Sequence, residues 1–378
     1  MKLLHDCRYL DAAFSGIGTY SRGVLEALAA LDEKNEHVAL VGPRFDGDLR
    51  VGPNFSLRSS PAPPVSFRTL TTLGALIERA RPTLVHSHFP LAPLRMQPPF
   101  IVTLHDLQPF TDPHFSGERT APVRFAYNQF YRTVYPAVLN RAKWVVCVSY
   151  ATRDAAAAML PSIKQKLVVV HSGVDGSIFQ QPGGEQIAAA RVAYKLDRPY
   201  ALYFGSTRPN KNLEAMVKAF GLMLQRGDPA VQDHQFVLVL KQDRFFSNVE
   251  RAIRIRGLAD RVRVLHQVSE DEKRVLLAGA DALFFATKFE GFGFPALEAM
   301  AQGVPVLAGR SGALPEICGE AAHFADPWDE EELAEAMHRV LADEELRGQL
   351  IDRGRLHAPR FTWRHTAEFL ADVYQLLV

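Results

Sequence analysis

The chain has 378 residues, of which 47% are hydrophobic and 22% charged, the composition of a soluble globular protein. That length exceeds one ordinary hydrophobic core, so we expect two domains. The 43 basic and 42 acidic residues leave a net charge of +1, which argues against nucleic acid as a partner.

Cysteine usage and the N-terminus bear on the compartment. Cys7, Cys147 and Cys318 are far apart and lack C-x-x-C spacing, which is typical of free thiols in a reducing cytosol. The N-terminal segment becomes polar too early for a signal peptide, and no apolar run reaches the ~18 residues of a membrane span. We therefore expect a cytoplasmic protein, with peripheral attachment to the inner face of the membrane left open.

Short apolar runs alternate with helical patterns along the first half of the chain, which predicts α/β architecture with parallel sheets. The expected strands are Lys2–Asp6, Val38–Val41, Leu84–Ser87, Phe100–Leu104, Trp144–Val148 and Leu167–Val170. The expected helices are Thr19–Leu31, Thr69–Arg79, Val123–Arg141 and Ala151–Met159.

A second series of the same kind begins near Tyr200. Its expected strands are Tyr200–Phe204, Gln235–Val239, Val262–Leu265, Ala282–Ala286, Val304–Ala308 and Ala321–Phe324. Its expected helices include Asn212–Arg226, Asp271–Gly279, Pro295–Ala301 and Asp329–Leu341. Gly173–Pro182 separates the two series and is a hinge candidate. We predict two Rossmann-like, doubly wound domains, residues 1–175 and 183–360, with a ligand cleft between them.

The first candidate site is the run Gly16-Ile-Gly-Thr-Tyr-Ser21, ahead of the first helix. Ser21 stands where a dinucleotide fingerprint needs its third glycine, and a long loop precedes the motif, so we reject a nicotinamide dehydrogenase. The motif instead predicts a glycine-rich loop, in which Gly16 and Gly18 approach a phosphate or sugar. A plain turn capped by Thr19 or Ser21 is the alternative.

Histidines end two strands of the first series. His105, followed by Asp106, stands at a carboxyl strand end, where ligands usually bind in α/β domains. Its imidazole could hydrogen-bond a substrate hydroxyl or move a proton near neutral pH, whereas Asp106 could simply cap the next loop. His86 and His88 end the preceding strand, but no third zinc ligand is placed, which favours a structural use and no metal site.

Arginines and aromatic residues are mixed along Arg119–Arg141. Such a segment could bind a phosphorylated or lipid-linked acceptor and contact a membrane surface. An amphipathic core helix with a solvated basic face is the simpler interpretation, and we prefer it.

Gly205 and Ser206 follow the first strand of the second series, and Arg208 and Lys211 stand just before the next helix. Both cations would point at charge that the helix dipole also favours, so the loop predicts a grip on a diphosphate. A solvated loop with two ordinary charges is the alternative.

The most informative segment runs from Lys288 to Glu298 and carries a second carboxylate at Glu290. Between the two glutamates lies a turn that leads into a helix and contains Gly291, Phe292, Gly293 and Phe294. Amides at a helix N-terminus favour an anion, and acids favour hydroxyls. The segment therefore predicts a ligand that is both a phosphate ester and a polyol.

With its continuation through Leu314-Pro-Glu316, this segment strongly resembles retaining glycosyltransferases of the GT-B fold, family 4, also described as glycosyl transferase group 1. The resemblance spans nearly the whole chain. Individually weak pieces follow in the family's order: Gly16-Ile-Gly-Thr-Tyr20, His105-Asp106, Val148-Ser149, Ser172-Gly-Val-Asp175, Lys211-Asn212 and Phe361-Thr-Trp363. The last begins what resembles the family's final helix, about residues 361–378, which returns to the first domain.

The resemblance implies a nucleoside-diphosphate sugar as donor substrate and no metal or other cofactor. Glu298 would hold the ribose hydroxyls, and Glu290 would contact the transferred sugar. Arg208 and Lys211, together with the amides of residues 291–294, would neutralise the leaving diphosphate.

His105 would touch the sugar at the reacting face, and the first glycine motif would close over it from the other domain. Many relatives carry an arginine just before the lysine or just after the strand glycine. Asn210 and Ser206 occupy those positions here, so Arg208 would have to substitute from a shifted place.

We therefore predict a hexosyltransferase of polysaccharide biosynthesis that acts on a glycan or lipid-linked acceptor, with a slight preference for GDP-mannose over a UDP-sugar. A retaining hydrolase needs two carboxylates about 5–5.5 Å apart, and the turn between the glutamates makes that pairing doubtful, so we favour front-face transfer. The Asp46-Gly-Asp48 run, the one Asp-x-Asp of the chain, lies in an early loop, which fits metal-independent chemistry.

Other functions of the same fold are a glycoside phosphorylase and a nucleotide-sugar epimerase. An inactive nucleotide-sugar-binding partner protein is an alternative of another class. It is disfavoured because both glutamates, Lys211 and His105 are present.

Overall fold

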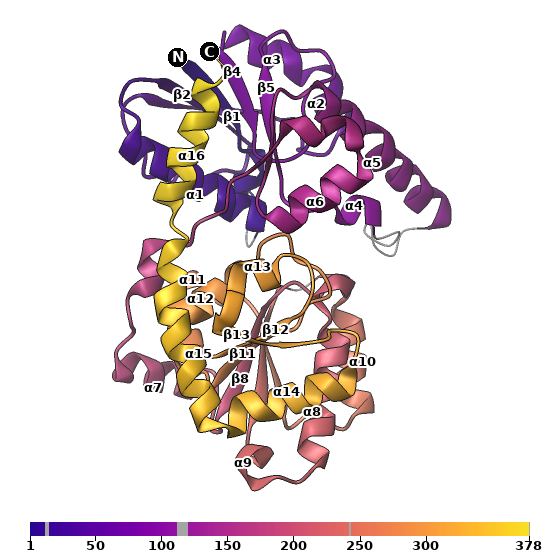
Figure 1. Cartoon of the computed structure of the whole chain (residues 1–378), viewed down its shortest axis with the longest axis vertical. Helices are drawn as coiled ribbons and strands as arrows, with labels where there is room; N and C mark the ends of the chain where they lie inside the picture. The colour runs from indigo at the N-terminus through magenta and orange to yellow at the C-terminus, as the bar shows by residue number, and fades with distance from the viewer. Residues whose placement is uncertain (12–14, 112–119, 242, 378) are drawn as a thin grey trace. The chain divides into compact units, whose positions relative to one another are not determined.

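The computed structural model describes residues 1–11, 15–111, 120–241 and 243–377 and divides the chain into two compact units. The first unit comprises Met1–Gly173 with Phe361–Val378, and the second comprises Val174–Arg360. Each unit is a parallel sheet with helices packed on both faces, which confirms the predicted doubly wound α/β class (Figure 1). Within the described ranges, no helix is long and apolar enough to cross a membrane.

The first sheet has the strand order β3-β2-β1-β4-β5-β6-β7. Its strands are β1 (Lys2–Asp6), β2 (Glu36–Val41), β3 (Phe55–Ser59), β4 (Leu84–Ser87), β5 (Phe100–Leu104), β6 (Val145–Cys147) and β7 (Leu167–Val169). Sequence patterning missed β3 because this edge strand is almost wholly exposed and has no apolar run to recognise.

The helices of the first unit cover the two faces of this sheet. They are α1 (Gly16–Leu31), α2 (Phe67–Thr71), α3 (Leu73–Arg79), α4 (Gln108–Thr111), α5 (Ala121–Arg141), α6 (Tyr150–Met159) and α16 (Trp363–Gln375). One face packs its leucines and valines against α3, α5 and α6. Because side chains alternate along a strand, histidines of β1, β2 and β4 point to the opposite face, beside α1 and α16.

The C-terminal helix α16 packs against α1 although the whole second unit precedes it in the chain (Figure 1). A Cβ on Gly23 of α1 would lie 2.1 Å from the Trp363 ring, so the absent side chain is what lets the two helices approach. Thr366 donates to the His171 carbonyl at 2.8 Å, which ties the helix to the end of the first chain segment.

The second sheet has the strand order β10-β9-β8-β11-β12-β13. Its strands are β8 (Tyr200–Gly205), β9 (Gln235–Leu240), β10 (Val262–Leu265), β11 (Ala282–Phe285), β12 (Val306–Gly309) and β13 (Ala322–Ala325). Its helices are α7 (Gly184–Ala193), α8 (Leu213–Gln225), α9 (Pro229–Gln232), α10 (Phe246–Ile255), α11 (Glu270–Ala278), α12 (Phe294–Ala301), α13 (Leu314–Cys318), α14 (Glu330–Ala342) and α15 (Glu344–His357).

Helices α7, α10 and α15 were not predicted. In α7 no residue is buried, and α15 buries only Leu350 and Gly354, so neither carries an apolar stripe that sequence periodicity can detect.

The segment expected as a hinge packs on the second unit from Val174 onward. The Gln302 side-chain amide of the helix α12 C-terminus donates to the carbonyl of Ile178 and, at 3.2 Å, to that of Gln180. The change between units therefore falls between Gly173 and Val174.

Candidate functional site

Lys211 and Glu290 meet at the carboxyl edge of the second sheet. Lys211 ends the short 3-10 helix η4 (Pro209–Lys211) after β8, and Glu290 follows the neighbouring strand β11. Their side chains are 21% and 12% exposed, and Lys211 Nζ lies 2.6 Å from Glu290 Oε1. The structure thus brings together two of the predicted catalytic residues as an ion pair that is still open to solvent.

Asn212 fixes the loop that carries this lysine. It adopts the left-handed conformation, with φ 61°, and is buried. Its side-chain amide donates to the carbonyls of Ala286, at 3.1 Å, and Pro327, at 2.6 Å. The two residues of the Lys-Asn pair therefore have different roles. The asparagine anchors the loop, and the lysine side chain projects from it.

The turn between the two glutamates is shaped by glycines. Gly293 caps helix α12 with φ 115°, a conformation that disfavours any residue with a side chain. Gly312, with φ 57°, packs behind Glu290, and the next amide, Ala313, donates to the Glu290 carbonyl at 2.9 Å. Phe292 is buried, with its ring centroid 5.0 Å from that of Phe294.

Substitution of Gly312 by alanine is expected to displace Glu290. The new Cβ would lie 2.6 Å from the Glu290 carbonyl oxygen, and the positive φ adds strain of about 1–2 kcal/mol. We expect a lower melting temperature and a loss of turnover. Gly348→Ala is the control, because that glycine lies in α15 with open space around its Cβ position, so alanine there should stabilise by about 0.5–1 kcal/mol. Equal effects of the two substitutions would contradict the close approach.

Glu298 projects from helix α12 and pairs with a lysine that the sequence analysis missed. Lys273, on α11, places Nζ 3.2 Å from Glu298 Oε2. Burial raises the pKa of Glu298, and the ammonium opposes this. Burial disfavours the charge on Lys273, but Glu298 and Glu270 outweigh it and raise its pKa. The signal for Lys273 is a contact in space, since its place in the sequence is an ordinary position inside a helix.

Gly205 and Ser206 form the exit from strand β8. A Cβ on Gly205 would lie 2.8 Å from the Tyr203 hydroxyl, which donates to the Ser206 carbonyl at 2.9 Å. The side chain of Arg208 is exposed at the start of η4, on the same loop as Lys211. The predicted cations therefore share one short loop, and Lys211 is held beside Glu290.

His105 ends strand β5 in the first unit. Its Nε2 lies 2.8 Å from the His88 carbonyl, which can only accept, so Nε2 carries the proton and Nδ1 is an acceptor. Burial lowers the pKa of His105 to about 4. The ring is therefore neutral at pH 7 and suits a hydrogen bond from a substrate hydroxyl rather than proton transfer near neutral pH. Asp106 accepts from the Gln108 amide at 3.0 Å, as expected for a loop cap.

The prediction of a glycine-rich loop at residues 16–21 is wrong. Helix α1 already begins at Gly16, and Ser15, not Thr19 or Ser21, is its cap, with Oγ 3.3 Å from the Gly18 amide. The serine cap starts the helix before the periodic apolar residues do, which hid the boundary. The Tyr20 ring of this motif packs edge-on against His105 at 4.9 Å between centroids.

A chain of buried imidazoles crosses the α1 face of the first sheet. Contacts of 3.1, 3.1 and 3.2 Å link Asp32 to His37, His37 to His5, and His5 to His88. The carboxylate only accepts, so His37 donates to it, His5 donates to His37, and His88 donates to His5. The Ser21 hydroxyl then completes the chain at His88 Nδ1, at 3.1 Å. Each ring is satisfied in its neutral form.

His86 stands beside this chain, with its two nitrogens 2.7 Å from the Tyr374 hydroxyl and 2.8 Å from that of Thr103. Among the described residues, His5, His86 and His88 could supply three metal ligands. Their six ring nitrogens already have hydrogen-bond partners, which supports the structural use of His86 and His88.

Helix α5 is chiefly a core element. Its residues Tyr131, Tyr135, Val138 and Leu139 are buried, as the preferred interpretation requires, while Phe125 near its start is exposed. Arg119 lies outside the described residues. A membrane contact through this segment stays a prediction.

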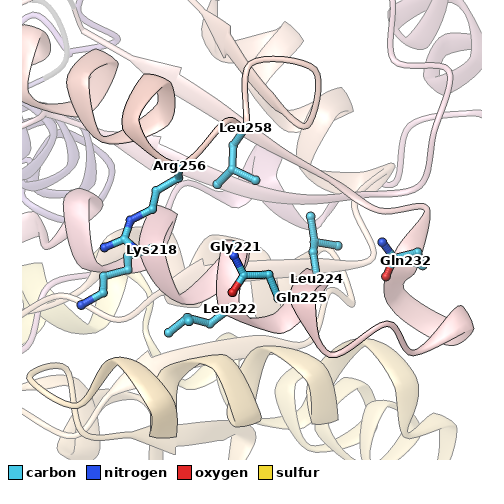
Figure 2. Close-up of a pocket in the computed structure, with 8 residues that line it drawn as sticks. All are labelled: Lys218, Gly221, Leu222, Leu224, Gln225, Gln232, Arg256 and Leu258. Carbon is cyan, nitrogen blue, oxygen red and sulfur yellow. The ribbon is translucent and has the colours of Figure 1, made fainter.

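A surface pocket of the second unit involves other residues. It is lined by residues of α8, by the last residue of α9 and by the segment after α10, among them Lys218, Gln225, Gln232, Arg256 and Leu258 (Figure 2). None of the predicted site residues lines it, so we do not assign it to the donor site.

Comparisons with known proteins bear on both units. A family model described as "Glycosyl transferases group 1" matches residues 185–357, and one described as "Glycosyltransferase Family 4" matches residues 14–177. The chain is 24% identical to the O-antigen chain mannosyltransferase B of Escherichia coli over 405 aligned positions, covering 100% of both chains.

Two further proteins are similar over different extents. The MMP alpha-(1->4)-mannosyltransferase of Mycolicibacterium hassiacum is 39% identical over 222 residues, which cover 56% of this chain and 48% of that protein. The solved structure of Anabaena Alr3699/HepE in complex with UDP and glucose has a TM-score of 0.75 and 16% identity, and the match covers 99% of each chain.

Proposed function

Since the two family models together span most of its length, this chain belongs to the group 1, family 4 glycosyltransferases of the GT-B fold, and we propose that it moves a mannosyl residue from a nucleoside-diphosphate sugar to a glycan or lipid-linked acceptor in polysaccharide biosynthesis. Two relatives bear mannosyltransferase names, one of them an O-antigen enzyme. The similar Anabaena protein was solved with UDP and glucose, which makes UDP the alternative to GDP as the donor base.

The observation that carries the proposal is the pairing of each glutamate with its own lysine in the second unit. Lys211 lies against Glu290, and Lys273 lies against Glu298. A sugar diphosphate needs cations for its phosphates and carboxylates for the hydroxyls of its sugar and ribose. Within one unit this site supplies both kinds of group.

In this mechanism, Lys211 and Arg208 stabilise the leaving diphosphate as its bond to the sugar breaks. Fixed cations and helix N-terminal amides can meet that growing charge without a bound metal ion. Glu290 orients the transferred sugar and the Lys211 ammonium at the same time. The acceptor hydroxyl attacks from the face that the diphosphate leaves, and a phosphate oxygen takes its proton, which retains the anomeric configuration.

A thermal-shift panel of UDP, GDP, ADP and TDP tests donor recognition. A ligand that binds the folded state stabilises by RT ln(1 + [L]/Kd), so a concentration of 100 Kd adds about 2.7 kcal/mol. For the cognate diphosphate we expect a rise of several degrees, and we expect GDP to produce the largest one. Glu298→Ala should abolish that rise, because the ribose loses its acceptor.

Glu335→Ala is the matched control, since Glu335 is an exposed acid of α14 that pairs with Arg226. Its melting temperature should rise with the nucleotide by as much as that of the unmodified protein. A full thermal shift in Glu298→Ala would refute the ribose role, and no shift with any of the four diphosphates would refute the donor class.

A further inference from the structure

Lys273 is enclosed in the second unit by groups from three elements. Its side chain is only 13% exposed, with Nζ 2.5 Å from Glu270 Oε2 and 3.2 Å from Glu298 Oε2. The same ammonium lies 4.9 Å from the centroid of the Phe204 ring at the end of β8. These contacts restrain its side chain more than the side chains of the flexible lysines of a helix surface.

Lys273 is also the cation that lies against the Glu298 carboxylate. The Oε2 atom of Glu298 is buried, and in the described part of the chain the Lys273 ammonium, 3.2 Å away, is the cation that compensates it. Two acids also act on Glu298: Glu270 on the same helix as Lys273, and Asp175 ahead of the 3-10 helix η3 (Gly176–Phe179). Without Lys273, the carboxylate would be buried beside two like charges.

We propose that Lys273 is a positioning residue of the donor site, which keeps Glu298 ionised and oriented with one oxygen inward and the other available to ribose hydroxyls. This inference rests on the proposed function, because Glu298 must be the ribose acceptor for the lysine to act through it. A protonated Glu298 would present a hydroxyl and lose acceptor capacity toward a diol.

The consequence is a dependence of nucleotide binding on pH. Burial raises the pKa of Glu298, and Lys273 opposes that rise. Removing the cation leaves burial, Glu270 and Asp175 to raise the pKa further. Lys273→Met should therefore bind the nucleoside diphosphate poorly where Glu298 is protonated and recover as the pH increases.

Calorimetric titration with GDP and UDP between pH 6 and 9 tests this. We expect Lys273→Met to bind about tenfold or more weakly at pH 6.5, equivalent to about 1.4 kcal/mol, and the deficit to shrink towards pH 9. Lys273→Arg should stay close to the unmodified protein. Lys218→Met is the control, since Lys218 pairs with Glu330 in the same unit and is not one of the predicted site residues. If Lys273→Met lost the same affinity at every pH, or lost no affinity, the proposal would be overturned.

A second measurement separates this inference from the ribose role. In Glu298→Gln, loss of GDP and UDP binding supports the ribose role, and unchanged binding refutes it whatever Lys273 does. When a carboxyl group has a higher pKa in the folded than in the unfolded state, the free energy of unfolding of the nucleotide-free protein falls as the pH rises above the unfolded pKa. Urea unfolding of Lys273→Met should show that loss, and Lys273→Met/Glu298→Gln should not. If the free energies of unfolding of the single and the double variant depended on pH in the same way, the role of Lys273 would be overturned.

Should Lys273→Met fail to give a folded protein by circular dichroism, Lys273→Gln is the substitute, since its amide can still donate to Glu298. Binding by Lys273→Gln with the pH profile of the unmodified protein would then count against a requirement for charge.

Discussion

Lys211→Ala is expected to lower the turnover of sugar transfer about 10²–10³-fold, the usual loss when one preorganised electrostatic donor is removed. Lys211 Nζ is held 2.6 Å from Glu290 at the end of a loop that Asn212 anchors. The loop therefore fixes the charge before the donor arrives, and no reorganisation is needed as the diphosphate departs. Steady-state kinetics with the cognate nucleotide sugar measure the effect.

The stability cost should be much smaller than the loss of activity. Glu290 is 12% exposed, so water can partly solvate the carboxylate that Lys211→Ala leaves unpaired, and we expect about 1–2 kcal/mol. Adding Glu290→Gln should restore most of that stability but none of the turnover. Lys218→Ala, the control, should leave the kinetics unchanged. Wild-type turnover in Lys211→Ala would rule out the diphosphate assignment.

The second large effect concerns pH and the first unit. The apo protein should lose stability steeply as pH falls from 6.5 towards 5, because buried imidazoles hold the α1 face of its sheet together. Burial is the main reason that the pKa values of His5, His86 and His88 lie well below their ordinary range, and neighbouring imidazoles add to it. Each ring is neutral in the folded state and gains a proton on unfolding.

The direction follows from proton linkage. Below the unfolded pKa of about 6.5 the unfolded chain binds more protons than the folded one, so stability falls as the pH falls. Each histidine contributes about 1.4 kcal/mol per pH unit until its own folded pKa is reached, so three contribute about 4 kcal/mol for each pH unit. That is a large part of the free energy of unfolding of a typical domain, which is about 5–15 kcal/mol.

Melting temperatures between pH 8 and 5 measure this, and hydrogen-exchange protection locates it. Above pH 7 the melting temperature should be flat with respect to these histidines. Below pH 6.5 the amides of β1 and β4 should lose protection before those of β8 and β11. His365→Gln, at an exposed position of α16, should keep the same pH profile. Equal loss of protection in both units would contradict an origin in the histidines of the first unit.

The sequence by itself determined the architecture because parallel strands are buried on both faces and therefore appear as apolar runs. Strands β1, β4, β5 and β10 have the predicted bounds, whereas the edge strand β3 was missed because it is exposed and has no apolar run. The two glutamates and Lys211 were also identifiable, because glycine turns and helix starts leave local signatures.

Only the tertiary structure decided which residues act together. The lysine of Glu298 comes from α11, 25 positions earlier in the chain, and nothing in its local sequence distinguishes Lys273 from a surface lysine. His5 of β1, His37 of β2 and His88 just after β4 form one hydrogen-bonded chain because neighbouring strands bring them to one face of the sheet. Their neutral forms, like that of His105, follow from burial. Local sequence encodes periodicity and turns, whereas charge state and pairing depend on which side chains meet out of water.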